Sequence, residues 1–180
     1  MRFLTVPECE EPVLRVGIDR RALLEHKRLY ALRNAADFFY KSRMSNARPV
    51  ANELVGLLGD FTFALLWVHA LPFGDGSRQE NPREDWRRYA QWRRSAGEDR
   101  ALYDVPGHLF DPNEGSKLAE AIEFAIYTGW DAFVFARPLR CVMALSHDDV
   151  IKIQSRHNLS SIAAGLRRLG LRQRDFHSPR

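Results

Sequence analysis

Histidine and aspartate residues recur where the chain is expected to turn, and these residue types exchange protons or bind hard metal ions. His108, His147 and Asp148 are the main candidates for such chemistry. The further residues of the same kind are His69, Asp75, Asp104 and Asp149. Aspartate is also a common turn residue, and a histidine at the edge of a core is often structural. A small hydrolase or metal enzyme is therefore our third hypothesis.

The common signatures of enzymes are missing from this sequence. It has no glycine-rich phosphate loop with its lysine, no dinucleotide fingerprint, no paired histidines of a zinc protease and no nucleophile elbow. Cys9 and Cys141 are too few for a secreted disulfide framework, and they lack the spacing of a metal motif. We therefore assign no catalytic residue, lean towards a protein without enzyme activity, and expect neither a metal nor a cofactor.

Three aromatic residues, Trp86, Tyr89 and Trp92, recur at three-residue steps in a segment that also carries Arg87 and Arg88. Residues at this spacing share one stripe of a helix. Such a stripe usually packs into a core, yet Trp, Tyr and Arg also dominate binding hot spots. The sequence leaves both interpretations open, a core stripe and a surface on which another protein binds.

Basic residues are concentrated near the C-terminus, because residues 155–180 contain six arginines and one aspartate. The candidates for contacts with phosphate groups or with an acidic protein surface are Arg167, Arg168, Arg172 and Arg174. Two of them, Arg167 and Arg168, also fall in the last turn of a predicted helix, where cations stabilise the helix dipole. A nucleic-acid-binding accessory protein is therefore our second hypothesis.

Length and composition predict one globular domain. The chain has 180 residues, of which 45% are hydrophobic, so a sizeable core can form, and we assign residues 1–170 to the domain and 171–180 to a loose basic tail. No apolar run is long enough to cross a membrane, and acidic residues interrupt the region where a signal peptide would need its apolar run. We expect a cytoplasmic protein.

The apolar pattern also predicts the order of the elements. A long helix is expected from Asp19 to about Met44 and a second one from Ser45 or Asn46 to Gly59, together forming a helical hairpin. Capping boxes at residues 81–84 and 111–114 predict two more helices, and Asn158 or Ser160 begins a last one. The predicted strands are residues 2–6, 13–18, 61–71, 131–136, 140–145 and 150–154.

These elements predict an α+β fold in which the N-terminal helical hairpin packs on a small mixed or antiparallel sheet of about four strands, with further helices on its faces. The first functional hypothesis is a non-catalytic protein-interaction module, such as an immunity-type inhibitor, an adaptor or an assembly subunit in a bacterial-type cytosol. Its partner is expected to be another protein.

Overall fold

The structure is a computed structural model, and it describes residues 1–25, 32–41, 45–71 and 84–174 of the chain. Asp75 and the first three residues of the predicted capping box at 81–84 lie outside the described residues.

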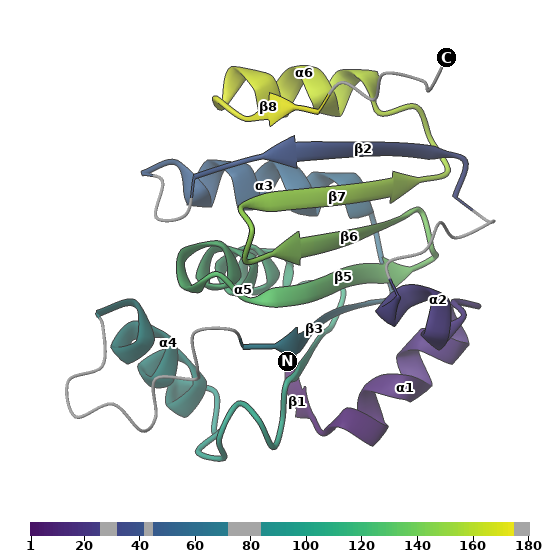
Figure 1. The fold of residues 1–180 in the computed structure, drawn as a ribbon. Helices are drawn as coiled ribbons and strands as arrows, with labels where there is room; N and C mark the ends of the chain where they lie inside the picture. Colours follow the sequence, from purple (N-terminus) through teal and green to yellow (C-terminus); the bar gives the residue numbers. More distant parts are fainter. Residues whose placement is uncertain (26–31, 42–44, 72–83, 175–180) are drawn as a thin grey trace.

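One antiparallel sheet forms the centre of the molecule, with the strand order β1-β4-β3-β5-β6-β7-β2-β8 (Figure 1). Its strands in chain order are β1 (Arg2–Leu4), β2 (Asn34–Phe39), β3 (Phe63–Ala70), β4 (Gly107–Phe110), β5 (Asp131–Arg137), β6 (Cys141–Ser146), β7 (Val150–Ser155) and β8 (Arg172–Gln173). The consecutive hairpins of β5, β6 and β7 place the later strands in the middle, so β2 reaches the sheet beside β7. The short strands β1 and β8 form its two edges.

Helices cover both faces of the sheet, but to different extents. One face carries α3 (Ala47–Leu58), α4 (Glu84–Ser95), α5 (Gly115–Thr128) and α6 (Ser160–Arg168) over the larger core. The other face carries α1 (Val6–Arg15) and α2 (Arg20–Leu24), whose buried residues pack with side chains of β3 and β5 (Figure 1). On this second face the side chains of Ala35 in β2 and Lys152 in β7 are exposed. The second face is therefore open near β2.

The α+β class is confirmed, and so are most elements after residue 45. Helix α3 ends at Gly59, which has a positive φ of 61°, and α5 ends at Gly129 in the left-handed conformation. The box that was predicted before α5 is present in part, because the Glu114 carboxylate accepts a hydrogen bond from the Asp111 N–H at 3.0 Å. Asn158 accepts from the Ser160 N–H at 2.8 Å at the start of α6. The helices therefore lie where they were predicted, although α5 begins only at Gly115, after the predicted box, with Glu114 as its N-cap residue.

The prediction of about four strands is wrong, because the sheet has eight. The predicted helical hairpin is also wrong: Asp19 does cap a helix, but α2 ends at Leu24, and residues 34–39 form β2. The alanines there favour a helix by propensity, whereas Ala36, Phe38 and Tyr40 are buried at every second position. Burial of that alternating face against the helices overrides the local preference.

The predicted strand at residues 13–18 is replaced by the end of α1. Thr5 and Glu8 form a capping box at its start, with the Thr5 N–H donating to Glu8 Oε2 at 2.7 Å. Cys9 and Val13 are four residues apart and both fully buried. Two strands were missed, β4 because its four residues lack β-branched side chains and β8 because it has only two residues.

Within the described part of the chain, no helix combines the length and the apolar character that a membrane crossing needs.

Candidate functional site

The predicted histidine candidates do not form one site. The ring of His147, in the turn between β6 and β7, contacts both carboxylate oxygens of Asp131 through Nδ1 at 2.9 Å. Its Nε2 lies 3.5 Å from Asp148. The hydrogen bond to Asp131 raises the pKa of His147. Since Asp131 also accepts the His147 backbone N–H at 2.9 Å, the carboxylate holds the turn against the start of β5.

His108 lies elsewhere, in β4, which β3 and β5 separate from β6. Three strand spacings amount to roughly 14 Å, so His108 and His147 cannot share a proton-transfer step. The His108 ring is fully buried and accepts or donates one hydrogen bond of 2.7 Å with the Tyr89 hydroxyl. Burial lowers the pKa of His108 to about 3, with a further contribution from the charge of Arg93. The imidazole is therefore neutral, and its hydrogen bond with the Tyr89 hydroxyl makes this pair a core contact.

The aromatic stripe of α4 packs into the core. Trp86 and Tyr89 have exposed fractions of 5% and 2%, and the ring centroids of both lie within 6 Å of that of Trp130, at 5.6 and 4.7 Å. Trp92 is partly buried, and its indole N–H donates to Glu120 of α5 at 2.9 Å. We therefore do not carry Trp86 and Tyr89 forward as partner-binding residues. Arg87 and Arg88 are exposed on the outer side of the helix.

The predicted C-terminal arginines divide into two groups. Arg167 of α6 and Arg174 after β8 line one cleft beside β2, whereas Arg168 and Arg172 are exposed but do not line it. Arg167 also donates through Nε to the Ala163 carbonyl at 3.1 Å, as a cation near a helix C-terminus can.

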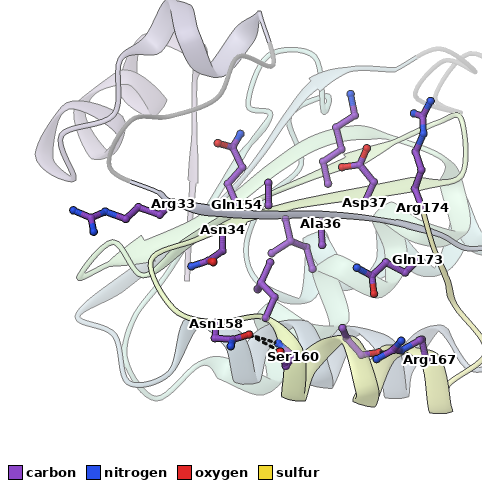
Figure 2. Close-up of a pocket in the computed structure, with 15 residues that line it drawn as sticks. Arg33, Asn34, Ala36, Asp37, Gln154, Asn158, Ser160, Arg167, Gln173 and Arg174 are labelled. Atoms are coloured by element: carbon purple, nitrogen blue, oxygen red, sulfur yellow. Dashed lines mark hydrogen bonds between the residues drawn. The ribbon is translucent and has the colours of Figure 1, made fainter. Parts of the chain in front are cut away.

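This β2 cleft has a volume of about 960 Å³ and runs along the edge of β2 (Figure 2). Its lining residues come from β2 and the residue before it, from β7, from α6 and the two residues before it, and from the β8 segment: Arg33, Asn34, Ala35, Ala36, Asp37, Lys152, Ile153, Gln154, Asn158, Leu159, Ser160, Ala163, Arg167, Gln173 and Arg174. Apart from five aliphatic residues, these side chains are amides and cations, together with the Asp37 carboxylate and the Ser160 hydroxyl.

Along the part of β2 that borders the cleft, the described residues leave the strand edge open. β8 pairs only with Phe38 and Phe39, and the last contact along this edge is the Arg174 N–H, which donates to the Asp37 carbonyl at 2.8 Å. Successive residues of a strand direct their peptide groups to alternate sides, so Ala35 faces the same edge as Asp37. None of the described residues forms a backbone hydrogen bond with Ala35 on that side.

The electrostatic character of the cleft is basic. Arg33, Lys152, Arg167 and Arg174 are exposed around it, and Asp37 is its one carboxylate among the described residues. Asp37 is only 9% exposed, and this burial raises its pKa, while the charges of Lys152 and Arg174 act in the opposite direction. The cleft thus offers an excess of positive charge to a ligand in solution.

Sequence reasoning found two of these four cations. Arg33 and Lys152 were missed because β2 was predicted as a helix, and only its pairing with β7 brings Lys152 opposite Asp37. The alternation of Ala36, Phe38 and Tyr40 was the signal that would have indicated the strand.

Metal chemistry has no support in the part of the chain that the structure describes, since no three His, Cys, Asp or Glu side chains there are grouped so that they could hold an ion. The lining residues of the β2 cleft include neither histidine nor cysteine. Comparison with known protein families, with curated proteins and with solved structures finds no match to this chain.

Proposed function

We propose that this protein is a non-catalytic protein-interaction module and that the β2 cleft binds an acidic segment of its partner. The observation that carries the proposal is the convergence of four exposed cations from four separate parts of the chain on one cleft beside an open strand edge. Complementary charge of this kind accelerates association and selects among partners.

The chemistry of the lining favours a binding role over a catalytic one. Ser160 is the one hydroxyl among the lining residues, and it donates to Asn158 Oδ1 at 2.6 Å. No histidine stands beside it in the cleft to activate it as a nucleophile. Asp37 is the one carboxylate among the described lining residues, and the lining offers it neither a histidine nor a second carboxylate with which to share a proton. The amides and cations bind and orient groups but do not exchange protons readily near neutral pH.

A protein partner is favoured over nucleic acid because the lining of the cleft has no aromatic side chain. Proteins that bind single strands combine a basic groove with aromatic side chains on which bases stack. The lining residues of the β2 cleft include no aromatic side chain, and its floor is built from Ala36, Ile153, Leu159 and Ala163. Small aliphatic side chains suit the side chains of a peptide better than the faces of bases.

Charge reversal tests this function. We would replace three of the cleft cations together, as Arg33→Glu, Lys152→Glu and Arg174→Glu, and would leave Arg167, whose Nε donates to the Ala163 carbonyl within α6. The control carries Arg87→Glu, Arg94→Glu and Arg137→Glu, which change the net charge equally at exposed positions outside the cleft. Proteins retained from native cells by the wild type would be identified, purified and titrated by calorimetry against all three forms.

The proposal predicts one purified partner that binds the wild type and the control alike and binds the cleft variant at least roughly tenfold more weakly. Its affinity should also fall as salt rises, because exposed charges are screened. Equal binding of the partner to all three forms would overturn the proposal. Binding of a labelled oligonucleotide that only the cleft variant loses would instead establish the nucleic-acid hypothesis.

A further inference from the structure

We propose that the partner segment binds as an added strand on the open edge of β2, and that it alternates acidic with small apolar residues. This inference rests on the proposed function and specifies the shape and the sequence pattern of the segment that the β2 cleft takes.

The cleft is lined by residues from both faces of one strand, β2. Asp37 lies on one face of β2, whereas Asn34 and Ala36 lie on the face towards α6 (Figure 2). Ala35 shares the face of Asp37, because side chains of a strand alternate, and all four residues line the same cleft. A ligand that fills this volume must therefore lie along the strand edge itself. An extended peptide does so naturally, because its side chains also alternate between the two faces.

This edge of β2 also carries backbone groups to which no described residue forms a hydrogen bond. Ala35 presents its N–H and C=O towards the cleft, beyond the point where the Arg174 N–H meets the Asp37 carbonyl. A peptide placed there would continue in line with β8 and would give Ala35 the backbone partners that a strand normally has. The four residues from Asn34 to Asp37 span about 13 Å, enough for a short added strand.

The two faces that the peptide would meet differ, because one carries cations and the other small apolar side chains. Arg174 points to the face of Asp37 (Figure 2), and Lys152 lies on that face too because it pairs with Asp37, so peptide residues that point there are expected to be acidic. On the other face lie Ala36, Leu159 and Ala163, with exposed fractions of 3%, 8% and 5%, and these accept small apolar side chains. The expected pattern is an acidic residue at every second position.

A second copy of this chain is a poor occupant of the same edge. Two β2 edges in contact would bring the four cations of one copy against those of the other. The positive charge therefore protects the edge from self-pairing and leaves it for an acidic strand.

Two end-blocked peptides of identical composition separate strand addition from simple charge attraction. One alternates Glu and Val over eight residues, and the other has four Glu followed by four Val. We expect the alternating peptide to bind at least tenfold more tightly in fluorescence anisotropy. Equal affinity of the two peptides, or no binding of either at about 1 mM, would overturn the inference.

The protein side of the test removes the backbone donor of the edge. Ala35→Pro deletes the N–H that faces the cleft without touching the ladder to β7, as prolines on edge strands can. We expect it to lose most of the affinity for the alternating peptide, whereas Ala35→Ser should keep it. If Ala35→Pro does not fold, an alternating peptide with N-methylated glutamates replaces it, because in antiparallel pairing the acidic residues opposite Ala35 turn their N–H groups towards β2. Unchanged binding of that peptide would contradict strand addition.

These results are distinguishable from those of the charge-reversal experiment. If the purified partner depends on the cleft cations but the two peptides bind equally, the proposed function stands and the added strand is overturned. A dimer of the wild-type chain that Ala35→Pro disrupts would show that a second copy occupies the edge, and this too would overturn the inference.

Discussion

Tyr89 and His108 form a buried polar pair that joins α4 to β4, with 2.7 Å between the hydroxyl and Nε2. Tyr89→Phe leaves the ring in place and removes the hydroxyl, so that one nitrogen of a fully buried imidazole loses its partner. We expect this change to destabilise the protein by about 1–3 kcal/mol in urea unfolding. Tyr103→Phe is the matched control, because Tyr103 is 58% exposed, and its unfolding free energy should not change. Equal stabilities of the two variants would contradict the assigned role of Tyr89.

The low pKa of His108 also predicts how stability depends on pH. Its pKa is about 3 in the folded state and 6.5 in the unfolded chain, so between these values only the unfolded state binds the proton. This group therefore stabilises the fold fully above pH 6.5, and its contribution is lost as the pH falls towards 3. From pH 7 to pH 5 we expect a loss of about 2 kcal/mol that is absent in His108→Gln. The difference between the two proteins in urea unfolding at both pH values measures it, and parallel behaviour would contradict the assignment.

At the scale of elements, α4 is expected to stabilise the core rather than to provide a surface. Trp86→Ala removes a large side chain that is 5% exposed and contacts Trp130, so we expect a loss of about 3–5 kcal/mol. Arg87→Ala, one residue further on the exposed side, should change stability by less than about 0.5 kcal/mol. Thermal unfolding of both variants checks this, and a wild-type melting temperature for Trp86→Ala would place the stripe outside the core.

Substitution by alanine is expected to destabilise the protein at Gly107 and to stabilise it at Gly56. A Cβ on Gly107 of β4 would lie 2.9 Å from the Leu4 Cβ of β1 and would also meet the Cys9 sulfur, so α1, β1 and β4 would have to separate. Gly56 in α3 has no atom within 4 Å of that position and lacks a positive φ, so alanine there should stabilise by about 0.5–1 kcal/mol. Chemical denaturation measures the change in the free energy of unfolding for both variants. A stabilising Gly107→Ala would show that Gly107 is not tightly packed against Leu4 and Cys9.

Local signals in the sequence were sufficient for the elements that depend on near neighbours. The strands β3, β5, β6 and β7 are long and apolar, and α3, α5 and α6 have clear starts or ends. The strands β2, β4 and β8 depend instead on pairing with distant segments, such as Phe38 with both Ile151 and Gln173. Propensity cannot report such pairing, which is why β2 was predicted as a helix and the cleft beside it was not foreseen.

At the scale of the whole molecule, the fold brings together basic residues that are far apart in the sequence. Only the arginines near the C-terminus were predicted as a basic region, yet the pairing of β2 with β7 and β8 brings Arg33 and Lys152 to the same cleft as Arg174. The α1 and α2 layer covers the other end of the same sheet face. Among the described residues, the fold thus leaves a basic strand edge open beside the cleft, while helices cover the apolar core on both faces of the sheet.

Binding of an acidic strand at the β2 edge beside the cleft is the central proposal. Amide hydrogen exchange at Ala35 tests it directly, because an N–H that faces solvent exchanges freely and one in a strand ladder is protected. With the alternating Glu and Val peptide in excess, we predict that exchange at Ala35 slows at least roughly tenfold, while exchange at exposed Arg87 of α4 is unchanged. Unchanged exchange at Ala35 under conditions in which the peptide is bound would contradict the account.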